Sequence, residues 1–205
     1  MSEVPSIKGS VFSHCVEKLL KLISAGKISW KELPGRLEPG DIEILKSPVQ
    51  PTRWYDIRIY ERILLLNRDV MGDGSNELLL EWGAKSAERL IRGGIYQQLD
   101  YLNRMQVGKE ADAQARFLAF GRDLRLLASL TSSVLNFLTT EVKVDPDQHD
   151  RYLIEYSGAA ACPEVFFWTN QGFINRMAAE HGHPDLWKWE RTSPDRVVYR
   201  MTRPV

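Results

Sequence analysis

The chain has 205 residues, of which 43% are hydrophobic and 26% are charged, a composition that suits one folded domain and argues against disorder. Its 27 Lys and Arg residues balance its 27 Asp and Glu residues, so it lacks the basic excess of proteins that bind nucleic acid or anionic membranes. Two cysteines are too few for a disulfide framework, and no apolar run resembles a signal peptide or a membrane span. We therefore expect a cytoplasmic protein with no nucleic-acid partner and no membrane insertion.

The first part of the chain predicts helices joined by turns. Apolar residues recur every three or four positions over 13–23, where Ser13 is the expected N-cap. A short helix is expected over 41–46. The same helical period predicts one amphipathic helix over 54–70 that begins at Trp54.

Three more helical stretches follow. The first lies between the turn at 71–76 and the Gly93-Gly94 pair, and the second covers 95–105. The third, over 111–138, is the longest, and a break is expected near Gly121 because glycine weakens a helix.

The last third of the chain has a different pattern. Alternating apolar and polar residues over 138–144 and 151–156 predict the two strands of a hairpin. A helical period returns over 162–181, and alternation over 186–191 and 196–201 predicts two further strands.

Together these patterns predict an α+β fold. An N-terminal helical bundle, residues 1–136, is expected to pack on a four-stranded antiparallel sheet formed within residues 137–205. The helix over 162–181 would cross that sheet, and the short chain favours one cooperative domain.

No catalytic signature is present, because the chain has no glycine-rich phosphate loop, no Gly-x-Ser-x-Gly elbow and no His-Glu-x-x-His pair. His181 and His183 would hold a metal if both lay on one strand face. Gly182 between them, however, suits the left-handed residue that ends a helix, and Pro184 suits the stop after it. We expect a helix end here, with no catalytic residue and no metal.

The two cysteines, Cys15 and Cys162, each lie near a predicted helix start, where a thiol can have a lowered pKa. Both are therefore candidates for a modified thiol. The alternative is that each is a small buried apolar residue.

Aromatic residues are numerous, and two interpretations apply to them. Most are expected in the core, but some would line a ligand cavity between the helices and the sheet. Trp187 and Trp189 would share one sheet face, since side chains in a strand alternate. The candidate ligand-binding residues are Tyr55, Trp82, Phe166, Phe173 and Trp187.

Three segments, residues 7–12, 54–55 and 81–96, resemble a paralogous family abundant in myxobacteria and other predatory or gliding bacteria. The C-terminal unit of two strands, a helix and two strands, with residues 171–177 and Gly182 in its helix, resembles another group. That group is the superfamily of heme-NO-binding proteins, 4-vinyl reductases and TRAPP subunits.

The superfamily resemblance implies binding instead of turnover, because its members hold heme, small apolar ligands or an acyl chain, or act as scaffold subunits. Its heme-binding members have a histidine on a helix and a Tyr-x-Ser-x-Arg motif, which Tyr156-Ser157-Gly158 does not match. No cofactor is therefore expected. We predict a non-enzymatic regulatory module that binds a small apolar ligand between helices and sheet and acts through a protein partner or as a homodimer. A scaffold or dimerisation subunit without ligand is the alternative, and a heme gas sensor is a weaker one.

Overall fold

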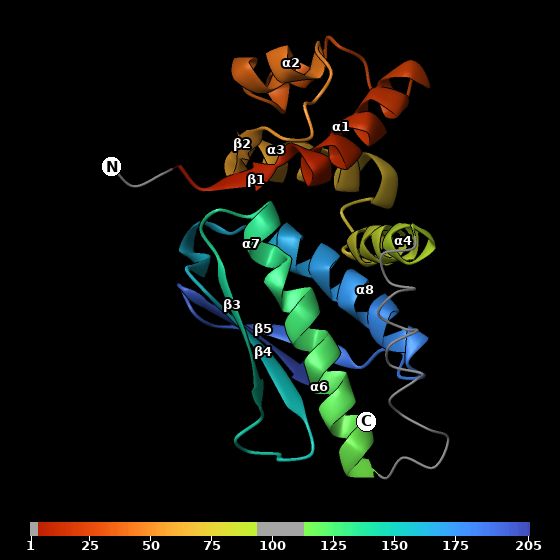
Figure 1. Cartoon of the computed structure of the whole chain (residues 1–205). Coiled ribbons are helices and arrows are strands. Elements are labelled where there is room, and N and C mark those ends of the chain that lie inside the picture. The colour runs from red at the N-terminus through yellow and green to blue at the C-terminus, as the bar shows by residue number, and fades with distance from the viewer. Residues whose placement is uncertain (1–3, 94–112) are drawn as a thin grey trace.

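The computed structural model describes residues 4–93 and 113–205, and its architecture is the predicted α+β fold. Figure 1 shows a helical part at one end and a four-stranded sheet at the other. Helices α4 (Glu77–Arg92) and α8 (Glu164–Glu180) lie between them. The helix predicted over 95–105 lies outside the described residues.

Two short antiparallel strands, β1 (Ser6–Lys8) and β2 (Trp54–Asp56), hold the helical part together. Each strand runs directly into a helix. These helices are α1 (Gly9–Ser24) and α3 (Ile57–Gly72).

The predicted helix starts at Ser13 and Trp54 are wrong, because contacts between distant segments override the helical period. The Gly9 N–H donates to the Arg53 carbonyl at 2.8 Å, and a Cβ on Gly9 would lie 2.0 Å from the Gln50 carbonyl oxygen. This close approach fixes the start of α1 at Gly9. Trp54 is a strand residue because its backbone pairs with β1.

The connection between α1 and β2 contains a single turn of 3-10 helix, η1 (Leu33–Gly35), and the short helix α2 (Pro39–Leu45). Helix α2 begins two residues before the predicted start, where Glu38 and Asp41 form a reciprocal capping box. Asp41 is only 1% exposed and accepts from Arg62 of α3 at 2.6 Å, which ties α2 to the bundle.

The longest predicted helix is two helices, α6 (Ala113–Ser129) and α7 (Thr131–Val134). The chain breaks at Leu130 and not at Gly121, which lies inside α6. A Cβ on Gly121 would lie 2.2 Å from the Tyr152 hydroxyl oxygen. The glycine therefore makes room for a tyrosine of the sheet instead of ending the helix.

The four predicted strands are present, each within two residues of its predicted bounds. They are β3 (Thr139–Val144), β4 (Tyr152–Ser157), β5 (Trp187–Ser193) and β6 (Arg196–Met201). All neighbouring strands are antiparallel in the order β3-β4-β6-β5, so β3 and β5 form the sheet edges. A second short turn, η2 (Ala159–Ala161), leads from β4 to α8.

One face of the sheet is buried beneath α6 and α8. Its large side chains, Tyr152, Tyr156, Trp187 and Tyr199, are at most 4% exposed. The Tyr199 hydroxyl donates to the Phe167 carbonyl at 2.7 Å, which joins the sheet to α8 at the centre of the core.

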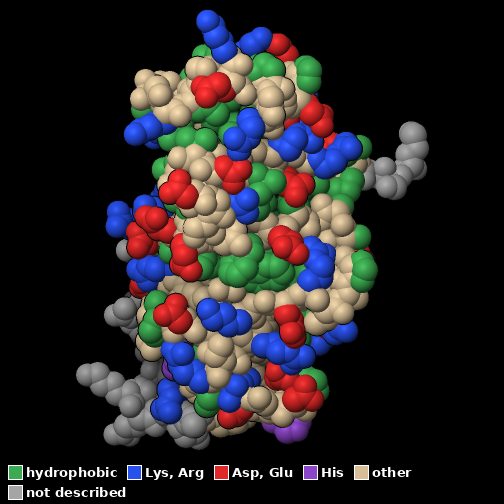
Figure 2. Space-filling model, turned by 180° about the vertical axis from the view of Figure 1, so that it is seen from behind, with side chains coloured by type: hydrophobic (Ala, Val, Ile, Leu, Met, Phe, Trp, Pro, Cys, Tyr) green, Lys and Arg blue, Asp and Glu red, His purple; other side chains and the backbone are tan. Residues whose placement is uncertain are grey.

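The opposite face of the sheet is polar. Arg200 pairs with Asp145 at 2.9 Å and with Glu190 at 3.3 Å. Figure 2, which views the molecule from behind Figure 1, shows acidic and basic side chains interspersed around a hydrophobic area. No helix in the described part of the chain is both long and apolar enough to cross a membrane.

Helices α4 and α8 cross with their backbones in contact. A Cβ on Gly83 would lie 1.8 Å from the Thr169 carbonyl oxygen, and a Cβ on Gly172 would lie 1.9 Å from the Leu80 carbonyl oxygen. Neither position has room for a larger residue. This pair of glycines therefore sets the distance between the helical part and α8.

Candidate functional site

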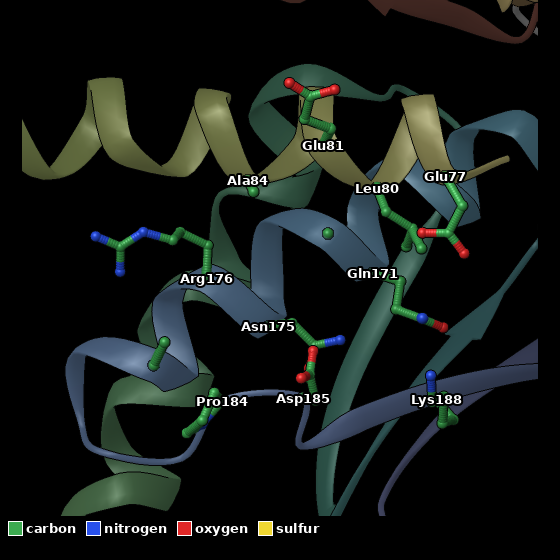
Figure 3. Close-up of a pocket in the computed structure, with 12 residues that line it drawn as sticks. Glu77, Leu80, Glu81, Ala84, Gln171, Asn175, Arg176, Pro184, Asp185 and Lys188 are labelled. Carbon is green, nitrogen blue, oxygen red and sulfur yellow. The ribbon is translucent and has the colours of Figure 1, made fainter. Parts of the chain in front are cut away.

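The α4–α8 crossing leaves a groove on one side, bounded at its far wall by the start of β5 (Figure 3). Its volume is about 400 Å³, and ligand sites in proteins span about 300 to 1,000 Å³. The residues that line it are Glu77, Leu80, Glu81, Ala84, Gln171, Gly172, Asn175, Arg176, Ala179, Pro184, Asp185 and Lys188.

The groove exists because its inner residues are small. Ala84 on α4 and Gly172 and Ala179 on α8 are among the lining residues, and Gly172 lies where the two helix backbones meet. A tight helix crossing therefore produces a hollow beside itself.

Gln171 is the buried polar residue of this groove, with an exposed fraction of 2%. Its Oε1 accepts the Trp189 N–H of β5 at 3.2 Å. Its Nε2 donates to no group in the described ranges, 4–93 and 113–205. Figure 3 shows the amide directed from α8 toward the wall that carries Lys188. An unpaired amide donor on a buried residue costs free energy unless a solvent or ligand acceptor meets it.

Asn175, one helical turn further along α8, uses its whole amide to hold β5. Its Oδ1 accepts the Trp187 N–H at 2.7 Å, and its Nδ2 donates to the Trp187 carbonyl at 3.1 Å. Together with Gln171 it covers the free edge of the sheet that β5 would otherwise expose. Sequence reasoning missed both residues, although two amides four positions apart in the predicted helix were the available signal.

The groove is lined by charged side chains of both signs. The side chains of Glu77, Asp185 and Lys188 form no ion pair within the part of the chain that the structure describes. Glu81 and Arg176, by contrast, are paired with neighbours on their own helices. The groove therefore offers two free carboxylates, one free ammonium and the Gln171 donor around a lining of short apolar side chains.

The five aromatic residues predicted as ligand walls do not meet in one chamber. Tyr55 lies in β2 with its ring 4.8 Å from that of Phe12. Trp82 lies in α4 beneath Lys18, whose Nζ is 3.9 Å from the ring centre. Both belong to the helical part of the molecule, and neither lines the groove.

The other three lie in the C-terminal part. Phe166 and Phe173 are half-buried on α8, and Trp187 is fully buried at the start of β5. Phe173 packs against Ala87 and Met177. Trp82 and Trp187 line two separate small pockets, so the predicted residues belong to different regions of the core.

The pocket beneath Trp187 lies between α6 and α8 and is small. Its volume is about 10 Å³, which is room for about one water molecule. The ring of Phe120 on α6 stacks over Trp187 with centroids 6.4 Å apart and an interplanar angle of 11°. Aromatic rings therefore occupy most of the space between α6 and the start of β5.

Both cysteines are buried, and neither has a lowered pKa. Cys15 lies within α1 instead of at its start, and its Sγ donates to the Phe12 carbonyl at 3.0 Å. Burial raises the pKa of the Cys15 thiol and of the Cys162 thiol. Modification of either thiol stays a prediction.

The stretch from His181 to Pro184 is the predicted helix end. Gly182 has φ 84°, the left-handed conformation, and the His183 N–H donates to the Ala178 carbonyl at 3.0 Å. No cluster of three or more potential metal ligands lies within the described residues.

The resemblance to the heme-NO-binding superfamily raises the question whether this chain holds a heme. The described pockets do not fit that group. The described pockets that contain a histidine have volumes of about 50 Å³ at His14 and about 10 Å³ at His181. His149 is exposed in the β3–β4 turn. Burial raises the pKa of both cysteine thiols. Neither of the described pockets that a histidine lines is large enough for a porphyrin.

Comparison with known proteins finds a likeness of fold. A structure solved in work on heme redox potential modulated through protein-induced porphyrin distortion matches with a TM-score of 0.50 and 12% identity, over 95% of this chain and 99% of that chain. A mutant of T. tengcongensis H-NOX matches with a TM-score of 0.48 and 12% identity, over 97% and 100%. No family model and no curated protein matches. The first of these matches shows a likeness of overall fold and no more. The resemblances to the heme-NO-binding superfamily and to the myxobacterial family stay predictions.

Proposed function

We propose that this chain is a non-enzymatic cytoplasmic regulatory module that binds a small molecule in the groove between α4, α8 and β5. The ligand lies between helices and sheet, as the sequence interpretation expected, but the groove favours a molecule with an apolar body and charged ends. A protein partner or a second copy of the chain would then recognise the ligand-bound arrangement.

The observation that carries this proposal is the amide of Gln171. Gln171 is 2% exposed and lines a groove of about 400 Å³. Its Nε2 donates to no acceptor in the described residues. The Gln171 Nε2 is not among the fully enclosed side-chain atoms that lack a partner, so it is open to the groove, and an open donor on this wall supports a ligand acceptor at that point.

The charges at the rim support a ligand that carries both signs. A cationic group would lie near Glu77 and Asp185, and an anionic group near Lys188, with the body over Leu80 and Ala84. Such a ligand would contact α4, α8 and the loop before β5 at once. Because it binds the closed arrangement of these elements better than an open one, it would shift the population toward the closed state.

Native mass spectrometry of freshly purified protein tests the proposal. We expect a bound small molecule in the unmodified protein, less of it in Gln171→Met, and an unchanged amount in Gln148→Met, which makes the same substitution on an exposed turn. A ligand-free dimer would instead support the scaffold interpretation. Equal retention by Gln171→Met would place the ligand elsewhere.

A visible absorption spectrum after heme supplementation separates this proposal from a heme sensor. We expect no Soret band, because the described residues offer no fitting axial ligand and chamber. A Soret band lost in one histidine variant would overturn that expectation.

A further inference from the structure

A second pocket lies on the other side of α4, between α1, α3 and α8, and the proposed function does not use it. Its volume is about 50 Å³. Val11, Leu64 and Trp82 form an apolar inner wall, and His14, Lys18 and Arg89 supply the polar groups.

Lys18 and Arg89 of this pocket form no ion pair with a carboxylate of the described residues. Lys18 stands over the Trp82 ring at 3.9 Å and forms no ion pair within residues 4–93 and 113–205. Arg89 donates only to the Ser86 hydroxyl, at 3.0 Å, among those residues. The nearby carboxylate, Glu81, is bound to Lys85.

The pKa values of these groups are lowered first by burial and then by the like charges around them. Burial, with the charges of Lys85 and Arg89, lowers the pKa of Lys18 to about 8, while Glu81 opposes that shift. Burial and the charge of Arg89 also lower the pKa of His14, although Glu17 raises it. The elements packed opposite contribute Tyr60 of α3, whose pKa burial raises, and the uncharged Thr169 of α8. A bound anion would relieve this repulsion.

The volume limits the size of that anion. One water needs about 10 to 15 Å³ of such space, so about 50 Å³ holds roughly three to five heavy atoms. The apolar wall favours a short hydrocarbon end over a fully polar ion. We propose that this pocket binds a small carboxylate of about two or three carbons, with its oxygens at Lys18 and Arg89 and its carbon end against Trp82 and Leu64.

The site is separate from the groove on the other side of α4, so either proposal can fail without the other. The test is a titration with propionate, with sodium chloride at equal ionic strength as the reference, followed by ¹⁵N–¹H NMR at the Trp82 indole. We expect a saturable shift with propionate and none with chloride. Binding should weaken as the pH rises from 7 to 9, because Lys18, with its pKa of about 8, loses its proton over that range.

Two variants decide whether the basic groups bind the ligand. Lys18→Met keeps an apolar stem over Trp82 and should weaken propionate binding about tenfold, the effect of one charge-assisted hydrogen bond. Arg89→Gln, at an exposed position, should weaken it similarly. Lys27→Met, at an exposed position whose charge does not act on Lys18, should leave binding unchanged. Equal shifts with chloride, or binding unaffected by both Lys18→Met and Arg89→Gln, would overturn the proposal.

Discussion

The two sides of α8 differ in how they use space. Toward α6 the helix meets stacked aromatic rings that close around about 10 Å³. On the side that faces α4, Gly83 and Gly172 allow the backbones of α4 and α8 to touch. Beside that crossing, the groove still has a volume of about 400 Å³. Large side chains fill the interior, whereas the small residues that allow backbones to touch leave room at the surface.

This difference is why we propose a ligand site away from the aromatic residues named in the sequence analysis, whose role in binding stays a prediction. Aromatic side chains bury large areas and pack against one another, so a cluster of them closes space. A ligand needs a hollow with a few directed polar groups. In this fold those groups are the amide of Gln171 and the unpaired charges at the rim.

The largest effect on stability is expected from Trp187→Ala, on the side of α8 that faces α6. The side chain is 0% exposed and stacks on Phe120, so its removal leaves a cavity and should lower the free energy of unfolding by about 3 to 5 kcal/mol. Urea unfolding measures the change. Trp30→Ala, at a residue that is 44% exposed, should change it by less than about 0.5 kcal/mol. Equal effects at the two positions would mean that the core does not depend on this stack.

The helix crossing is broken by Gly172→Ala, because the new Cβ would lie 1.9 Å from the Leu80 carbonyl oxygen. We expect a loss of about 1 to 3 kcal/mol or more, since backbone atoms cannot move aside as a flexible side chain does. The matched change, Gly35→Ala, meets nothing within 4 Å and should be nearly neutral. A stable Gly172→Ala protein would show that α4 and α8 can separate freely.

Asn175→Ala tests how firmly α8 holds β5, the strand that borders both the groove and the aromatic pocket. This change removes both hydrogen bonds to Trp187 and should cost about 1 to 3 kcal/mol, because it leaves backbone groups of β5 without those partners. Hydrogen exchange measures it site by site. The Trp187 amide should exchange faster, while the Lys188 amide, whose residue pairs with Arg200 of β6, should not.

The smallest expected effect is a pH dependence at the end of α8. Burial, aided by the charge of Arg203, lowers the pKa of His183 below its ordinary 6.5. The unfolded chain therefore binds the proton more readily, and stability should fall as the pH drops through 6.5 toward the folded pKa. His183→Gln should reduce this slope in thermal unfolding, whereas His149→Gln, in an exposed turn, should not. An unchanged slope in His183→Gln would contradict the shift.

Periodicity predicted the fold where local pattern and tertiary structure agree. The four strands and α8 have strong patterns, and the structure has them within two residues of the expected bounds. Prediction failed at Trp54, where pairing with β1 overrides a helical period, and at Gly121, which makes room for Tyr152. The groove could not be predicted, because it depends on which residues of α4 and α8 approach one another, and one sequence does not specify that crossing.

The central claim is that ligand occupies the polar groove and not the aromatic pocket. The molecule recovered by native mass spectrometry is titrated into the protein, and ¹⁵N–¹H NMR spectra are recorded. In these spectra the Gln171 side-chain amide reports on the groove, and the Trp187 indole N–H reports on the aromatic pocket. We predict a saturable shift of the Gln171 amide with little change at the Trp187 indole. A shift of the Trp187 indole with an unmoved Gln171 amide would contradict the account.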